Sequence, residues 1–215
     1  MRLAPFVLGL LATASVHAGA SYTGTINWLS GEAPGNPRGS GATTTSVDHI
    51  RFVVHTEADI TFDVLSAEVN DDNQPVDLNG DGRIAFIDSM IMLFQGDGHL
   101  DVHDYIDASD DYGDADDNGS LYPMDSYMTL HLMPGQYVLA ISSFFLTPED
   151  AVNGINTHSD GPFTVDSRGD FFIERSGDYR VDIIGDADIM LPTPGTVALP
   201  AMALVGFARR RRTRE

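Results

Sequence analysis

The sequence predicts an all-β protein, a jelly-roll-like antiparallel β-sandwich of about eight or nine strands interrupted by two Asp-rich loop insertions. Three observations indicate this fold class: apolar and polar residues alternate, turn residues separate the alternating segments, and amphipathic helix patterns are nearly absent. In residues 49–55, Ile50, Phe52 and Val54 share one face, and residues 59–64 alternate in the same way. A strand with one face in water is typical of an antiparallel sandwich.

The remaining elements are predicted from weaker patterns. Residues 29–45 are rich in Gly, Pro, Ser and Thr, which predicts a loop. Residues 89–95 are almost entirely apolar and fit either a central strand or a buried helical turn. Thr147 followed by Pro148 resembles the start of a short helix. Further strands are expected at residues 21–28, 126–133, 136–145, 171–174 and 178–184.

Both ends of the chain resemble processing signals. Residues 1–20 fit a secretory signal peptide, with Arg2 as the charge, an apolar run, and small residues for cleavage after Ala18 or Ala20. A buried N-terminal helix is the alternative interpretation. Residues 21–191 then form one domain, which is long enough to bury a substantial core.

The composition excludes several classes of function. The chain has 32 acidic residues against 12 basic ones, all Arg, and a formal net charge of −20, so nucleic acid is not expected as a partner. Most of the acidic residues are Asp, which favours loops and cation ligands over helix faces. A salty habitat also explains net charge, but not loop spacing. Cys is absent, which excludes disulfides and thiolate chemistry.

Residues 77–88 match the twelve-residue pattern of a calcium loop. The oxygen-donating positions 1, 3, 5, 7 and 12 hold Asp77, Asn79, Asp81, Arg83 (through its backbone carbonyl) and Asp88. Gly82 holds position 6, where the chain must turn sharply. Because Ca²⁺ takes six to eight oxygen ligands, this spacing lets one short curved segment supply most of them.

A second copy of the pattern occupies residues 114–125. Its corresponding positions hold Asp114, Asp116, Asn118, Ser120 and Asp125. Pro123 at position 10 departs from the usual pattern, and both loops end in Asp, which reaches less far than the usual Glu. Moderate affinity for Ca²⁺ is therefore expected. The alternative is that either loop is a plain solvated turn, since Asp, Asn and Gly are also turn residues.

The order of segments resembles the bacterial pre-peptidase C-terminal domain over residues 46–185. The segments that carry the resemblance are VDHIRFVV, ADITFDV, DSMIMLFQGDG, DSYMTLHLMPGQYVLAI and GDYRVDI. Asp88 and Asp125 match the family's Asp before a strand, and Pro134, Gly135 and Tyr137 match its turn before a Tyr-rich strand. The resemblance implies a jelly-roll-like sandwich in a secreted protein that is usually not catalytic itself. The calcium loops are insertions beyond the minimal pattern.

The C-terminal segment, residues 192–215, resembles the Pro-Glu-Pro (PEP-CTERM) sorting signal of bacteria that produce exopolysaccharide. The motif residues are Pro192, Thr193, Pro194 and Gly195. An apolar run at 197–208 and an Arg cluster at 209–212 come next, although Thr193 replaces the family's Glu. Residues 189–208 would extend about 30 Å as a helix, just enough to cross a bilayer. The resemblance implies a processing protease of the exosortase type, a transient inner-membrane anchor, and sorting to the cell surface or extracellular matrix.

No local motif predicts an enzyme. Neither the HExxH nor the GxSxG motif occurs, and His99 and His103 have no evident third metal ligand. Asp pairs are so abundant that no glycosidase pair stands out. The prediction is therefore a non-catalytic protein.

Two interaction modules remain as alternatives. The first loop is similar to half of a dockerin, but a dockerin needs a helix after each loop, and Pro123 and the alternation in 126–132 oppose one. In a carbohydrate-binding module, Tyr105, Tyr112 and Tyr122 would stack on sugars, unless they cover a small core of their own loop. Extracellular polysaccharide or surface proteins are the partners that these alternatives imply.

Overall fold

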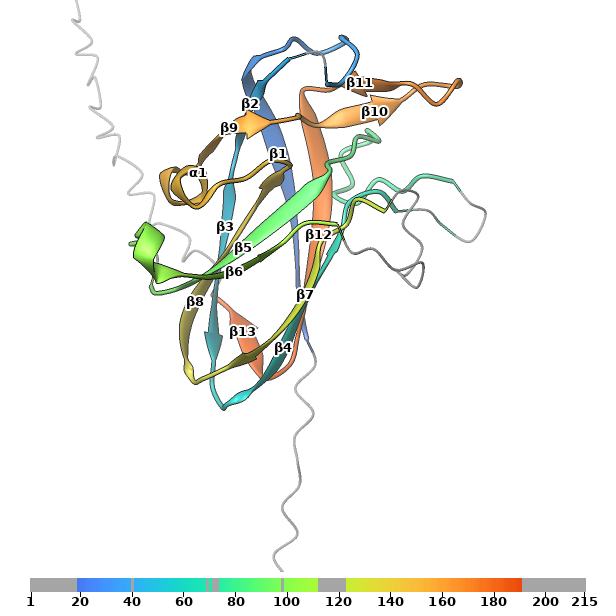
Figure 1. Ribbon diagram of the computed structural model, residues 1–215. Coiled ribbons are helices and arrows are strands. Elements are labelled where there is room, and N and C mark those ends of the chain that lie inside the picture. Colours follow the sequence, from blue (N-terminus) through green and yellow to red (C-terminus); the bar gives the residue numbers. More distant parts are fainter. Residues whose placement is uncertain are drawn as a thin grey trace, which may run out of the picture.

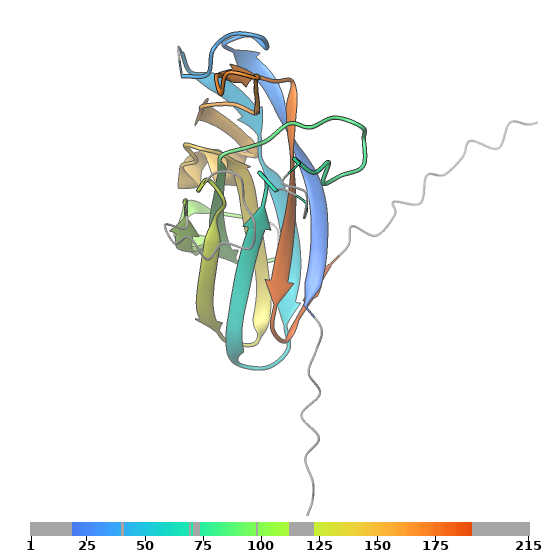
Figure 2. The same ribbon diagram turned by 90° about the vertical axis from the view of Figure 1, so that its right-hand side faces the viewer.

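The chain folds into an antiparallel β-sandwich (Figure 1). The structure is a computed structural model that describes residues 19–39, 41–68, 70, 74–97, 99–111 and 123–190. Thirteen strands and a single short α-helix lie within these described residues. The predicted all-β sandwich is thus confirmed. Figure 2 shows that the long strands of both sheets lie along roughly the same axis.

Two sheets form the sandwich and a hairpin caps one end. The six-stranded sheet, in the order β7-β4-β12-β1-β2-β9, contains β1 (Ala20–Gly31), β2 (Thr43–Ser46), β4 (Ala58–Leu65), β7 (Tyr127–Leu132), β9 (Ile155–Ser159) and β12 (Ser176–Ile184). The five-stranded sheet, in the order β13-β3-β8-β5-β6, contains β3 (Asp48–Val54), β5 (Ser89–Gln95), β6 (Tyr105–Ser109), β8 (Gly135–Ser143) and β13 (Ala187–Ile189). The hairpin consists of β10 (Phe163–Val165) and β11 (Phe171–Ile173).

The main core lies between the two larger sheets. It is built by the alternating strands, so Phe52 of β3 and Phe62 of β4 meet edge-to-face with ring centroids 5.4 Å apart. Tyr179 of β12 is fully buried there, and its hydroxyl donates to Asp48 Oδ2 at 2.8 Å. Burial of apolar surface is the dominant favourable contribution to folding, and large aromatic side chains supply much of that surface.

Strand β5 resolves the ambiguity of residues 89–95, because they form a central strand paired with both β8 and β6. Both of its faces are buried. Ile91 and Leu93 enter the main core, whereas Met92 and Phe94 enter a second cluster on the outer face of the sheet. A strand buried on both faces has a continuous apolar sequence, which is why periodicity alone could not identify it.

The predicted short helix is confirmed as α1 (Pro148–Asn153), which covers this second cluster. Thr147 is its N-cap and accepts from the Asp150 N–H at 3.2 Å. Gly154 ends the helix with a left-handed φ of 73°, a conformation that favours glycine. A 3₁₀ turn, η1 (Val102–Asp104), lies between β5 and β6.

The strands beyond the predicted eight or nine are mostly short or weakly patterned: β2, β6, β9, β10 and β13. β2 lies at the end of the predicted loop 29–45, and β6 lies in the polar region after Leu100, where Tyr105 and Ile106 are exposed. These strands are short, or lie at the edge of a sheet as β6, β9 and β13 do, so their sequences need not alternate strongly.

The two predicted processing signals fall almost wholly outside the described part of the chain. The signal peptide lies outside it except for residues 19–20, and Ala20 already begins β1. The sorting segment 192–215 lies outside it entirely. Among the described residues, no helix has the length and apolar character needed to cross a membrane.

Candidate metal centre

The loop that begins at Asp77 curls around the carboxylate of that residue. The N–H groups of Gly80 and Gly82 donate to Asp77 Oδ1 and Oδ2, each at 2.7 Å. Both glycines have left-handed φ angles, 79° and 85°, which side-chain-bearing residues rarely adopt. The hydrogen bond from Gly82, together with those of its neighbours, lowers the pKa of Asp77, so this carboxylate stays ionised.

The next two predicted ligands continue the same turn. Asn79 Oδ1 accepts from the Asp81 N–H at 2.9 Å, and Asp81 Oδ1 accepts from the Arg83 N–H at 2.8 Å. These short local bonds hold alternate side chains in a fixed orientation, as Asx-type turns do. The Arg83 side chain turns outward to Glu174, 3.6 Å away.

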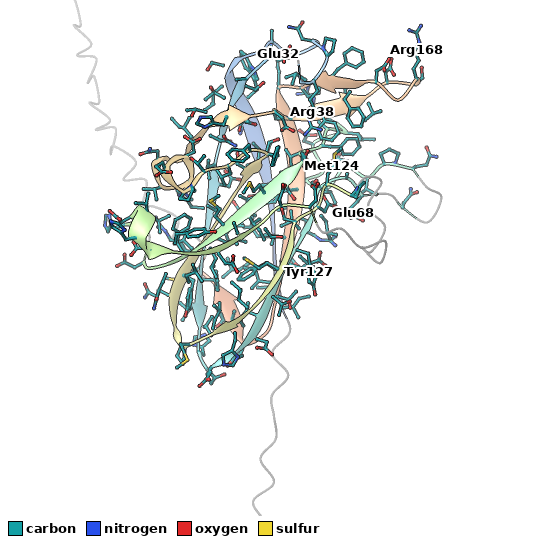
Figure 3. The ribbon with its side chains drawn as sticks, viewed as in Figure 1. Glu32, Arg38, Glu68, Met124, Tyr127 and Arg168 are labelled. Atoms are coloured by element: carbon teal, nitrogen blue, oxygen red, sulfur yellow. The ribbon has the colours of Figure 1, made fainter. Side chains whose placement is uncertain are left out.

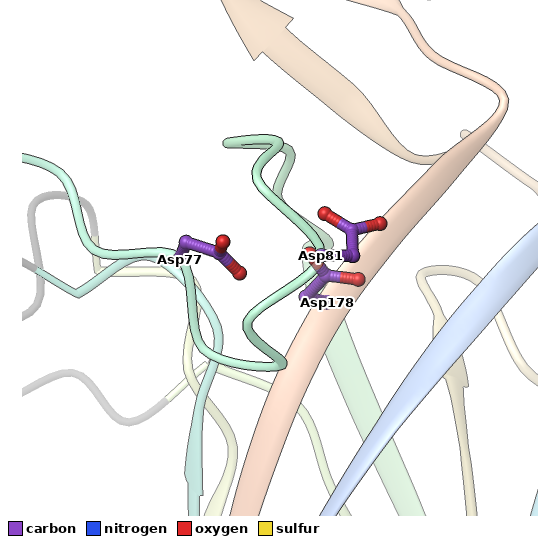
Figure 4. A group of neighbouring side chains, drawn as sticks. All are labelled: Asp77, Asp81 and Asp178. Atoms are coloured by element: carbon purple, nitrogen blue, oxygen red, sulfur yellow. The ribbon is translucent and has the colours of Figure 1, made fainter.

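A third carboxylate joins this loop from the six-stranded sheet. Asp178 of β12 lies close to Asp77 and Asp81, and one oxygen from each of the three falls within 4.8 Å of the others (Figure 4). Asp178 is only 3% exposed. Its Oδ1 accepts from Asn79 Nδ2 at 2.6 Å and from the Thr25 hydroxyl at 3.1 Å, so the group is tied to β1 as well.

The loop is held against β12 by main-chain contacts next to Asp178. The Asp178 N–H donates to the Ala85 carbonyl at 3.0 Å, and Phe86 exchanges two backbone hydrogen bonds with Phe163 of the hairpin. A Cβ on Gly177 would lie 2.2 Å from the Phe86 carbonyl oxygen, so only glycine permits this approach. Figure 2 shows the segment before β5 standing out beside β12.

The electrostatics of the group favour an added positive charge. Burial, together with the nearby Asp81 and Asp77 carboxylates, raises the pKa of Asp178 to about 6, against the lowering by the Thr25 hydrogen bond and Arg83. Three carboxylates that share one small space repel each other when all are ionised. A proton or a metal cation relieves this repulsion.

The predicted twelfth ligand does not join this group. Asp88 lies instead with Asp110 and Asp111 in a second acidic group, where Arg38 Nη2 donates to Asp88 Oδ2 at 2.6 Å. Residues 85–87 are buried and bonded to β12 and β10, so the chain runs straight into β5 and carries Asp88 away from Asp77. Asp178, from strand β12, supplies the third carboxylate of the group that contains Asp77 and Asp81.

Asp88 sits in a strongly acidic environment. Burial, together with Asp111 and Asp110, raises its pKa to about 7, although Arg38 acts to lower it. Burial likewise raises the pKa of Asp110. Neither of the two acidic groups found among the described residues contains a His. Tyr105, which the sequence suggested as a sugar-stacking residue, packs edge-on against Phe94.

The second predicted loop is described only at its end. Asp114, Asp116, Asn118 and Ser120 lie outside the described residues, as do Tyr112 and Tyr122. Asp125 is 2% exposed, and its Oδ1 accepts from the Ser66 N–H at 3.0 Å and from the Ser66 hydroxyl at 2.5 Å. In this structure Asp125 therefore fixes the chain that leaves β4.

Comparison with known proteins gives little further guidance. No protein-family model matches the chain, and no curated protein matches it. Among solved structures, it is similar to the pre-peptidase C-terminal domain of the collagenase from Bacillus anthracis, with 14% identity, a TM-score of 0.35, and coverage of 77% of this chain and 89% of that one. This similarity is too low to identify a family, and the fold assignment rests on the sheets themselves.

Proposed function

We propose that this protein is an exported, non-catalytic β-sandwich that a structural Ca²⁺ ion stabilises. The observation that carries the proposal is the convergence of Asp77, Asp81 and Asp178 on one short, tightly turned loop. Carboxylate oxygens on a curved segment, with an additional ligand from elsewhere, are the donor set that Ca²⁺ prefers. The ion would join the loop to strand β12 and would offset the repulsion among the carboxylates.

The remaining ligands would come from the same loop. The Asn79 side-chain oxygen, the Arg83 carbonyl and water would complete the six to eight oxygens that Ca²⁺ requires. Mg²⁺ demands a tighter octahedron and should bind more weakly. The second loop, at residues 114–125, is proposed as a weaker site of the same kind.

The alternative of a dockerin-like module is disfavoured by the elements that come after the loops. Strand β5 begins one residue after Asp88, and Asp125 is succeeded by Ser126 and then by β7. A dockerin needs a helix at both places. A carbohydrate-binding role remains compatible with the sandwich.

We further propose that the protein is exported and sorted to the cell surface or extracellular matrix. The support is the N-terminal signal, the C-terminal motif, and the acidic composition without Lys or Cys. An exosortase-type protease would process the tail after a transient stay in the inner membrane, and extracellular polysaccharide or surface proteins would be the partners. Deletion of residues 192–215 should release the protein into the medium, whereas an unchanged distribution would refute the sorting role.

The direct test of the calcium role is calorimetric titration of the purified chain. Ca²⁺ should bind with a dissociation constant of roughly 10⁻⁴ to 10⁻³ M, as in extracellular modules, and Mg²⁺ should bind less well. NaCl at matched ionic strength is the control for simple screening of the acidic surface. A specific site is refuted if the heat of binding and the melting temperature respond equally to Ca²⁺, Mg²⁺ and NaCl.

A further inference from the structure

A pocket lies at the hairpin end of the sandwich, apart from the Asp77, Asp81 and Asp178 group. Its volume is about 390 Å³, and the side chains that line it are Arg38, Asp88, Met124, Phe144, Asp160 and Phe171. Small-molecule sites have volumes of about 300–1,000 Å³, so this pocket would suit a small ligand. Figure 3 labels Arg38 and Met124, which lie close together at this end.

Main-chain hydrogen bonds build the pocket from five separate segments. The Arg38 N–H donates to the Phe171 carbonyl at 2.9 Å, which joins the loop after β1 to β11. The Phe144 N–H donates to the Asp88 carbonyl at 2.7 Å, and the Asp160 N–H donates to the Phe144 carbonyl at 2.5 Å. The lining residues are therefore held in place by the backbone.

Arg38 presents to the pocket one hydrogen-bond donor that lacks a strong acceptor among the described residues. Its guanidinium lies 4.4 Å from the centre of the Phe163 ring, and Nη2 donates to both Asp88 and Asp160. Nη1 faces only the Met124 sulfur, at 3.8 Å, within the described residues. Because a thioether is a weak acceptor, Nη1 can still donate to a ligand oxygen.

Asp88 presents the complementary acceptor. Its Oδ2 is paired with Arg38, but its Oδ1 accepts no hydrogen bond from any described residue. Asp160 is more fully used, since its Oδ1 accepts from the Ser143 hydroxyl at 2.8 Å. Within the described residues, a donor without a strong acceptor and an acceptor without a donor thus lie side by side on one bridged Arg–Asp pair.

We propose that this pocket binds the ring of a neutral sugar. An anionic ligand would be repelled by Asp88 and Asp160, and an ammonium ligand, which has no acceptor, could not use the Nη1 donor of Arg38. A ligand with adjacent hydroxyl groups can satisfy both the donor and the acceptor, since one hydroxyl accepts from Arg38 Nη1 while its neighbour donates to Asp88 Oδ1. The apolar C–H face of the ring would lie against Phe144 and Phe171.

The volume suits a monosaccharide or disaccharide end rather than a long chain. Tyr105, the described member of the three tyrosines that the sequence suggested, does not line this pocket. The proposed sugar site also goes beyond the structural role of Ca²⁺, since Asp77, Asp81 and Asp178 do not line it.

The test is saturation-transfer NMR on the purified full chain with a panel of neutral methyl glycosides and disaccharides. Matched uronic acids and amino sugars provide the charged counterparts. At least one neutral glycan should bind, and calorimetry should show that Arg38→Lys weakens it by about tenfold or more, because this variant keeps the charge but loses the Nη1 donor. Phe144→Leu, which retains bulk without an aromatic face, should also weaken binding.

Two control variants make the outcome decisive. Asp188→Asn removes one acidic charge from β13, where the side chain is 74% exposed, and should leave binding unchanged. Tyr105→Ala should do the same. The proposal is overturned by no neutral glycan binding at about 1 mM, by charged sugars binding more tightly, or by equal affinity in Phe144→Leu and wild type. Repeating the titration in chelator separates this result from the calcium proposal.

Discussion

Replacement of Asp178 by Asn gives the sharpest test of the metal centre. The carboxylate is buried, and its Oδ1 accepts two hydrogen bonds, from Asn79 and Thr25. The Asn side-chain oxygen can keep both bonds, and the new amide group would point toward the other carboxylates. The substitution therefore removes charge with little loss of packing.

The expected size of the effect is set by the pKa of Asp178. That pKa is about 6, against an ordinary value of 3.8, a difference of about two units at about 1.4 kcal/mol each. Because the folded-state pKa is raised, the protonated group favours the fold at low pH, and this advantage is lost as the pH rises through about 6. At pH 8 without Ca²⁺, Asp178→Asn should therefore raise the free energy of unfolding, by about 3 kcal/mol at most.

Calcium should remove this advantage of the variant. Wild type gains about 1.4 kcal/mol when free Ca²⁺ is tenfold above the dissociation constant, and about 2.7 kcal/mol at a hundredfold. The variant lacks a ligand and should gain little. The difference in stability between the two proteins should narrow steadily as Ca²⁺ is added, because only wild type is stabilised.

Thermal melting at pH 8, in chelator and in stepped Ca²⁺, measures both effects. One kcal/mol corresponds to about 2–4 °C for a domain of this size. Asp188→Asn is the matched control for loss of one acidic charge at an exposed site. A metal centre at Asp178 is refuted if Asp178→Asn melts lower than wild type in chelator and still responds fully to Ca²⁺.

Four further outcomes are expected. Asp81→Ala should abolish most of the calcium-dependent rise in melting temperature, with Mg²⁺ unable to restore it; a response like that of wild type would count against the site. Gly177→Ala should lower the free energy of urea unfolding by about 1–3 kcal/mol, since its Cβ would collide with a neighbouring carbonyl oxygen. Thr147→Ala should cost about 1 kcal/mol in the same assay through loss of the helix cap, with Thr147→Ser nearly neutral. In calcium-free buffer the melting temperature should fall as the pH rises through about 6 to 7, because burial raises the pKa of Asp178 and Asp88; a rise over that interval would contradict this.

The strands that the sequence predicted most clearly have one face in the core and the other at least partly in water. The side chains of β3 and β4 therefore alternate visibly, whereas β5 is buried on both faces and its sequence was ambiguous. The strands that were missed lack this constraint. β9 has the sequence Ile-Asn-Thr-His-Ser, in which Asn156 is fully buried and Ile155 is 44% exposed, because a buried polar network rather than an apolar core holds it.

The candidate site was predictable only where it is local. Asp77, Asn79 and Asp81 lie within five positions, and the turn that relates them depends on glycines in the same segment. Asp178 could not be found this way, because its position depends on how β12 pairs with β1 and β4. The available signal was an Asp placed directly before the buried Tyr179, near the start of an alternating strand.

The position of Asp88 shows how the element after the loop selects the loop's ligands. In a loop that leads into a helix, the chain turns back, and the twelfth position can face the first. Here the chain continues into β5, which pairs over its whole length with β8 and must run along the sheet. That direction carries Asp88 to Arg38. The third carboxylate beside Asp77 and Asp81 therefore comes from strand β12, as Asp178. In a sandwich, therefore, the loop spacing identifies the first ligands, and the pairing of the sheet determines which residue replaces the last.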